Sequence, residues 1–297
     1  MFINNFANFY KTFDNEKIFF VKNFEHIDHE KPVLFFNYGL VCSNHHWKYQ
    51  VDFFDRKGYQ MIIHDYRGHF QSTGSKNVSS ITFANIAKDI AGLCDYLGVK
   101  KALMLGHSMG VNVCLELAKS YPDLVAGQVL ISGTFVNVKD VMFDSNIMEF
   151  LAPLAELGLE KYPEAFNKIW TTTGMNPVVR EIVHATGFNR MKVSQDFIEI
   201  YLNRVGQLGA EIFFQLYNEM TKQNITSSLE GMKMPSLVIG GQKDNVIPNH
   251  IQRTLASLLG NSEMYFLKEG SHVPQADYPD MINERIELFI QQKISQS

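Results

Sequence analysis

The chain has 297 residues and a net charge of −4, with 45% apolar and 20% charged residues. These values are typical of a globular protein, and the length allows either a large core with one insertion or two domains. The charges form no long run of one sign, so the sequence gives no reason to expect a nucleic-acid partner.

The cysteines and the N-terminus bear on where the protein works. Cys42, Cys94 and Cys114 are odd in number, lie in apolar surroundings and show no paired or metal-binding spacing. This pattern favours buried, reduced thiols and a cytoplasmic location. The N-terminus lacks a positive region followed by a continuous apolar stretch, so we expect no secretory signal. No segment reaches the ~18 uninterrupted apolar residues that a membrane span needs.

Aromatic residues gather in the first 13 positions, namely Phe2, Phe6, Phe9, Tyr10 and Phe13. Their spacing predicts one side of a helix. Packing of this helix on the domain is the favoured interpretation, because its opposite face carries little positive charge. Weak contact with a lipid surface is the alternative, and stable membrane insertion is not expected.

The elements that follow alternate between strand and helix. Pro32 precedes a continuous apolar run, Val33–Phe36, which is typical of a strand buried on both faces in a parallel sheet. In chain order, the sequence predicts β structure over 11–37, a helix over 45–57, a strand over 60–64, a helix over 81–97, strands over 101–105 and 129–132, a strand over 236–239, a helix over 249–259, a strand over 264–267 and a helix over 279–293. This alternation favours parallel β-α-β units.

The alternation breaks between residues 135 and 231, where the periodicity is helical. We therefore predict an α/β core formed by residues 1–135 and 231–297, with residues 136–230 inserted as a helical block. The Met and Phe content of this block suggests an apolar pocket, although packing within the block accounts for most of these side chains. They are Met142, Phe143, Met148, Phe150, Phe166, Met175, Phe188, Met191, Phe213 and Phe214.

The most informative motif is Gly-His-Ser-Met-Gly at Gly106–Gly110. It follows an apolar run, Ala102–Leu105, and precedes a helical one, Val111–Ala118. A serine between a strand and a helix lies on a sharp, strained turn that exposes its hydroxyl, and the flanking glycines avoid collisions with neighbouring elements. Ser108 is therefore the candidate nucleophile.

A serine hydroxyl needs a base that accepts its proton and a third group that orients the base. Histidine is suited to that role near neutral pH. His272 lies in a loop between a predicted strand and the last helix, and Asp244 lies in a loop after another predicted strand. Ser108, Asp244 and His272 are therefore predicted to form a catalytic triad.

This chain order resembles that of the α/β-hydrolase superfamily, over nearly the whole chain outside the helical block. Residues Asp65–Ser72 resemble the family's D-x-R-G-x-G-x-S loop, with Phe70 in place of the second glycine, and Asp277–Pro279 resembles the acidic-x-proline start of its last helix. The resemblance implies an α/β fold: a mostly parallel sheet of the eight-stranded type, flanked by helices, with the helical block as a cap over the serine.

Residues Asn37–Leu40 occupy the place of the family's His-Gly loop, with Tyr38 before Gly39 instead of histidine. The glycine is what the geometry needs, because a backbone N–H must point into the site. By resemblance, the two donors of the oxyanion hole are the N–H groups of Leu40 and Met109.

The superfamily includes many reactions, so the fold does not select one. A serine nucleophile argues against haloalkane dehalogenase and epoxide hydrolase activity, since those relatives use aspartate. Small bacterial carboxylesterases and monoacylglycerol-type lipases have a similar serine motif, and we expect hydrolysis of a carboxylic ester or thioester with a hydrophobic acyl or alkyl group. C–C bond hydrolysis, acyl transfer and cofactor-free perhydrolysis stay open. So does a non-catalytic binding protein, although such proteins have usually lost a triad residue.

Other candidate sites are weaker. His45 and His46 are adjacent and lack a matching carboxylate spacing, which favours a loop near the mouth of the cleft over a metal site. Asp65 and Arg67 are expected to tie the loop that follows them to the core. The sequence contains no glycine-rich phosphate loop, so we expect no metal, nucleotide or other cofactor. The expected partner is a small-molecule ester, and the oligomeric state is not predicted.

Overall fold

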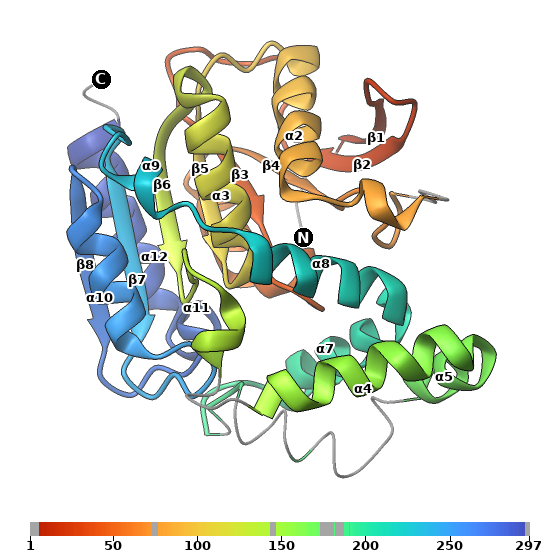
Figure 1. The fold of residues 1–297 in the computed structure, drawn as a ribbon. Coiled ribbons are helices and arrows are strands. Elements are labelled where there is room, and N and C mark those ends of the chain that lie inside the picture. The colour runs from red at the N-terminus through yellow and green to blue at the C-terminus, as the bar shows by residue number, and fades with distance from the viewer. Residues whose placement is uncertain are drawn as a thin grey trace.

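The computed structural model describes residues 6–72, 77–142, 147–172, 181, 187–189 and 191–294. An eight-stranded sheet with the strand order β1-β2-β4-β3-β5-β6-β7-β8 forms its centre (Figure 1). The strands are β1 (Phe6–Lys11), β2 (Lys17–Lys22), β3 (Val33–Asn37), β4 (Gln60–His64), β5 (Ala102–His107), β6 (Val125–Ile131), β7 (Ser236–Gly241) and β8 (Ser262–Leu267).

The helices form two groups. Those of the sheet region are α1 (Lys48–Arg56), α2 (Phe83–Leu97), α3 (Met109–Ser120), α10 (Asn249–Leu258), α11 (Pro274–Asp277) and α12 (Pro279–Phe289). Those between β6 and β7 are α4 (Ile147–Lys161), α5 (Pro163–Thr171), α7 (Gln195–Leu208), α8 (Ala210–Lys222) and α9 (Thr226–Leu229). Short 3-10 turns are η1 (Asn44–Trp47), η2 (Val78–Ser80), η3 (Pro122–Leu124) and η4 (Val138–Asp140), and a π turn, η7 (Ile290–Ile294), follows α12.

The central strands are parallel and buried. β4, β3, β5, β6, β7 and β8 pair in parallel, whereas β2 pairs antiparallel with β4 and with β1. Every residue of β3, β4, β5 and β7 is buried, because helices cover both faces of a parallel sheet, and this explains the continuous apolar runs of the sequence. The predicted α/β class and mostly parallel sheet are confirmed.

The start of β6 differs from the prediction. β6 begins at Val125, not at residue 129, although Gly127 and Gln128 interrupt the apolar run. Gln128 is buried and its Nε2 donates to Ser236 Oγ at 3.0 Å, so a hydrogen bond to the neighbouring strand replaces the apolar contact that the pattern requires.

The predicted N-terminal helix is wrong. Phe6–Lys11 form β1, which pairs with β2 across a turn in which Asn15 adopts a φ of 69°. The ring of Phe9 packs edge-on against Phe19 at 5.6 Å, a cross-strand contact that a helix would not make. Phe2 lies outside the described residues.

The state of the three cysteines and the lengths of the helices test two of the predictions. Cys42, Cys94 and Cys114 are free and buried, as predicted. Burial raises the pKa of the Cys94 thiol to about 12, so it stays protonated at neutral pH. Among the residues that the structure describes, no helix has the length and apolar character needed to cross a membrane.

Helices α4, α5, α7 and α8 gather at one end of the sheet, whereas α9 lies beside α10 (Figure 1). α4 contacts α5 and α8, and α5 contacts α7. The indole Nε1 of Trp170 in α5 donates to the carbonyl of Val205 in α7 at 3.1 Å. In the described part of residues 136–230 the regular elements are helices, in agreement with the predicted periodicity. The division of the chain into a core and an inserted cap at those boundaries stays a prediction.

A buried arginine ties the loop after β4 to the rest of the core, as predicted. Arg67 donates through Nε and Nη2 to both carboxylate oxygens of Asp89 in α2, each at 2.7 Å. Its Nη1 reaches Asp14 of the β1–β2 turn at 2.8 Å. The side chain of Arg67 is 0% exposed, so these two carboxylates supply the compensation that a buried guanidinium requires.

Asp89→Ala is therefore expected to lower the free energy of unfolding by about 3 kcal/mol, because it leaves the Arg67 guanidinium buried with half of its compensation. Chemical denaturation measures the change. Asp95→Ala, at an exposed position of the same helix, is the matched control and should change the free energy of unfolding by about 0.5 kcal/mol or less. Equal effects of the two variants would contradict the role of the buried pair.

Candidate active site

Ser108 lies between β5 and α3 in a conformation that serine rarely adopts. Its φ is 53° and its ψ is −121°, so the sheet and the helix must hold it there. A Cβ at position 106 would lie 2.5 Å from the carbonyl oxygen of Gly110, and a Cβ at position 110 would lie 2.2 Å from that of Asn37. Only glycines at both positions allow the strand, the turn and the helix to approach this closely.

The structure brings the three predicted triad residues together at the carboxyl ends of three strands. Ser108 follows β5, Asp244 lies in the loop after β7, and His272 lies in the loop after β8. The imidazole Nε2 of His272 is 3.0 Å from Ser108 Oγ. Its Nδ1 is 3.0 Å and 3.1 Å from the two carboxylate oxygens of Asp244.

Backbone groups fix the carboxylate of Asp244. Its Oδ1 accepts the N–H groups of Val246 at 2.9 Å and Ile247 at 3.0 Å, and its side chain is 0% exposed. An acceptor-only carboxylate beside Nδ1 requires that Nδ1 carry the proton, which leaves the Nε2 lone pair free to face Ser108.

A second histidine supports the loop that carries His272. The ring Nε2 of His107 is 2.9 Å from the carbonyl oxygen of His272, and because a carbonyl can only accept, His107 donates from Nε2. Burial holds the pKa of His107 well below its ordinary value, so the ring is neutral. The sequence pattern indicates no role for His107 beyond its place before the serine, since no local pattern reveals a contact across 165 positions.

The adjacent histidines do not form the loop that was predicted. They belong to the 3-10 turn η1, where the Ser43 side chain caps the backbone. His46 is buried, and burial lowers its pKa to about 3, whereas the half-buried ring of His45 packs against Phe197 at 5.3 Å. In the described part of the chain, no cluster of three or more His, Cys, Asp or Glu could hold a metal ion.

The segment Asn37–Leu40 passes beside the serine. Asn37 pairs with Gly106 in the sheet, and a Cβ at position 39 would lie 2.9 Å from Ser108 Cβ. Leu40 is half-buried, and Met109 is the first residue of α3, so its N–H has no acceptor within the helix. The two predicted oxyanion donors therefore belong to segments that flank Ser108.

The loop after β4 packs against this segment. Phe70 stands where the resemblance predicts glycine, and it adopts a φ of 39°. Its ring lies 6.3 Å from that of Tyr38, and the guanidinium of Arg204 from α7 lies 4.7 Å above it. Asp65 accepts the amide N–H of Gln71 at 3.1 Å, which closes the loop.

Apolar side chains join the α7 region to the loop of His272. The cluster contains Phe188, Val193, Phe197, Ile198, Leu202, Val273 and Ala276. Of the Met and Phe residues predicted to form an apolar pocket, Phe188 and Phe214 are buried in packing contacts and Met191 is 92% exposed. The positions or side chains of Phe143, Met148, Phe150 and Met175 lie outside the described part.

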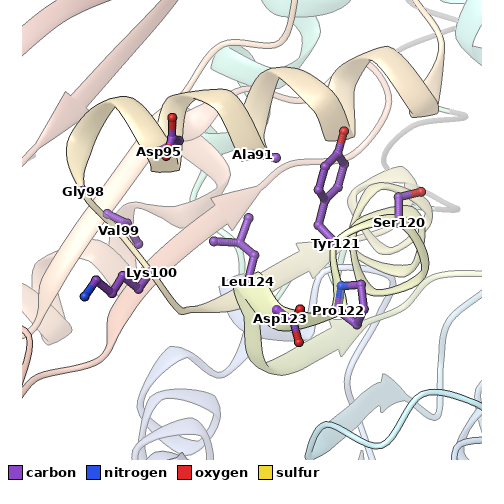
Figure 2. Close-up of a pocket in the computed structure, with 10 residues that line it drawn as sticks. All are labelled: Ala91, Asp95, Gly98, Val99, Lys100, Ser120, Tyr121, Pro122, Asp123 and Leu124. Atoms are coloured by element: carbon purple, nitrogen blue, oxygen red, sulfur yellow. The ribbon is translucent and has the colours of Figure 1, made fainter.

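Figure 2 shows a surface pocket elsewhere, between the end of α2 and the segment that leads into β6. Val99 and Lys100 precede β5, so the pocket lies at the amino end of the strand whose carboxyl end carries Ser108. Its lining residues include no histidine, and it takes no part in the constellation around Ser108.

Comparisons with known proteins agree with the α/β fold described above. The sequence matches the alpha/beta hydrolase fold family over residues 32–279, so the chain belongs to that family. It is 28% identical to the bifunctional esterase/perhydrolase DCH of Acinetobacter calcoaceticus, over 88% of this chain and 92% of that protein. An esterase of Exiguobacterium antarcticum has the same fold, with a TM-score of 0.76 and 17% identity over 97% of this chain and 100% of that chain.

Another relative is longer than this chain. Protein ABHD8 of Homo sapiens is 27% identical over 87% of this chain, but the match covers 55% of that protein. The chain thus spans about half the length of this relative and of its mammalian counterparts.

Asp65 should make stability depend on pH in a defined direction. Burial raises its pKa to about 6, so the folded protein takes up a proton there, whereas the unfolded chain does so near pH ~4. Lowering the pH from 7 to 5 should therefore stabilise the wild type by about 1 to 2 kcal/mol relative to Asp65→Asn, which cannot titrate. Denaturation of both proteins across this range measures the difference, and a difference that stays constant or shrinks toward pH 5 would contradict it.

Proposed function

We propose that this chain is a serine hydrolase that cleaves carboxylic esters or thioesters through an acyl-enzyme on Ser108. The observation that supports the proposal is the unbroken hydrogen-bonded series from Ser108 Oγ through the His272 imidazole to the Asp244 carboxylate. The esterase named among the relatives supports the reaction class.

The proposed first half-reaction forms the acyl-enzyme. His272 Nε2 takes the proton of Ser108 as Oγ bonds to the carbonyl carbon of the ester, and Asp244 stabilises the resulting imidazolium. The negative oxygen of the tetrahedral intermediate accepts the N–H groups of Leu40 and Met109, each of which contributes about 3 kcal/mol to the transition state. The intermediate then expels the alkoxide, which takes the proton from His272.

The second half-reaction reverses these roles. His272 removes a proton from water, whose oxygen attacks the acyl carbon, and the intermediate collapses to a carboxylic acid while Ser108 regains its proton. Neither half-reaction requires a cofactor. We propose a hydrophobic acyl or alkyl group on the substrate, a role for residues 136–230 as a cap over Ser108, and a cytoplasmic location in view of the free, buried thiols.

Ser108→Ala is expected to lower kcat by about 10⁵-fold or more, because the members of a triad act as a unit. Hydrolysis of a panel of p-nitrophenyl esters from C2 to C16 measures the loss and the preferred chain length together. Ser132→Ala is the matched control: Ser132 follows the neighbouring strand β6, is buried and has a similar φ of 51°, but it lies outside the triad. The proposal fails if Ser108→Ala keeps more than about 1% of wild-type turnover.

Perhydrolysis is a second candidate reaction, favoured by the perhydrolase activity in the name of the Acinetobacter relative. In this reaction hydrogen peroxide replaces water as the acceptor of the acyl group, and a peracid replaces the acid. We expect the carboxylic acid to be the main product when an ester is supplied with both acceptors, because water is in large excess. Chromatography of the products decides, and peracid as the main product would assign the chain to the second reaction.

A further inference from the structure

The turn that carries the proposed oxyanion donor Leu40 is strained. The N–H of Cys42 donates to the carbonyl of Gly39 at 3.1 Å, which closes the four-residue turn Gly39–Cys42. Its third residue, Val41, has a φ of 55°. A β-branched side chain disfavours this left-handed conformation, so the turn needs support from its surroundings.

Two tyrosines next to the turn form a reciprocal pair. The hydroxyl of Tyr66 donates to the backbone carbonyl of Tyr38 at 3.0 Å, and the backbone N–H of Tyr66 donates to the hydroxyl of Tyr38 at 3.1 Å. The ring centroids lie 4.5 Å apart. Tyr38 is 0% and Tyr66 is 1% exposed, so water cannot replace either hydrogen bond.

The backbone around Tyr66 is held in place by its neighbours. Tyr66 lies between Asp65, whose carboxylate accepts Asn44 Nδ2 at 3.1 Å, and Arg67, whose guanidinium is held by two carboxylates. The hydroxyl of Ser72 also donates to the Asp65 carbonyl at 2.6 Å. The pair therefore connects the strained turn to a rigid part of the core.

We propose that Tyr38 and Tyr66 form a clasp that positions the turn Gly39–Cys42 against Ser108, and that both are positioning residues for the acyl transfer proposed above. The clasp fixes the Tyr38 carbonyl, one peptide before the turn. Within the turn, the Gly39 carbonyl faces the Cys42 N–H. Because the C=O and N–H of a trans peptide point in opposite directions, the Leu40 N–H is directed out of the turn. Tyr38 thus supports this loop from the position directly before Gly39, where the resemblance predicts histidine.

Tyr66→Phe tests the clasp because it removes one oxygen and retains the ring. Displacement of the Leu40 N–H reduces stabilisation of the transition state more than it reduces substrate binding. The kcat should therefore fall about 10- to 100-fold, while KM changes by about twofold or less. Tyr59→Phe, the same substitution at a partly buried tyrosine before β4, is the matched control and should keep wild-type kcat and KM. Unchanged kcat in Tyr66→Phe would overturn the proposal.

A rescue distinguishes positioning from general destabilisation. Glycine adopts a φ of 55° without strain, so Val41→Gly added to Tyr66→Phe should raise kcat by about threefold or more over Tyr66→Phe alone. A further loss of kcat in the double variant would overturn the claim that the clasp opposes strain in the turn.

Amide exchange tests the clasp without reference to any reaction. In Tyr66→Phe the Cys42 amide should exchange with deuterium about 10-fold faster than in the wild type, with no change in Tyr59→Phe. An unaltered Cys42 exchange rate would overturn the clasp even in an active esterase. A wild type without esterase turnover would overturn the proposed function instead, and the exchange rate would then decide whether the clasp holds the turn.

Discussion

The close approach of three backbone segments around Ser108 is the constraint on which the rest of the site depends. The segment that follows β3, the serine turn and the first turn of α3 meet where glycines at positions 39, 106 and 110 leave no room for a Cβ. This packing places Ser108 beside the predicted oxyanion donors and turns its hydroxyl toward the loop of His272, 164 positions later in the chain. A Cβ at any of these three positions would force the neighbouring atoms to shift.

Backbone strain is concentrated at the carboxyl ends of the central strands, where Ser108 lies. Val41, Phe70, Ser108 and Ser132 have positive φ values, and they follow the neighbouring strands β3, β4, β5 and β6. Among the described residues other than glycine, Asn15 in the hairpin turn is the one further case. Such conformations persist only where the surroundings over-determine them, and here the buried strands, the Arg67 ion pairs and the tyrosine pair provide that support.

Sequence reasoning succeeded where one local pattern carries the information. The continuous apolar runs predicted the buried parallel strands. The serine motif with its flanking strand and helix predicted the strained turn that carries Ser108. The N-terminal prediction failed because Phe6 and Phe9 fit the period of a helix, while antiparallel pairing with β2 decided the structure. The hydrogen bond between His107 and the His272 carbonyl and the pairing of Tyr38 with Tyr66 could not be predicted from the sequence, because these contacts join distant positions with no periodic signal.

The most direct measurement is a crystal structure of the protein after reaction with an alkyl fluorophosphonate, whose tetrahedral phosphorus mimics the acyl-transfer intermediate. We expect a bond between phosphorus and Ser108 Oγ, with the phosphoryl oxygen about 3 Å from both the Leu40 and the Met109 nitrogen. A probe bound to another residue, or a phosphoryl oxygen directed away from these two amides, would contradict it.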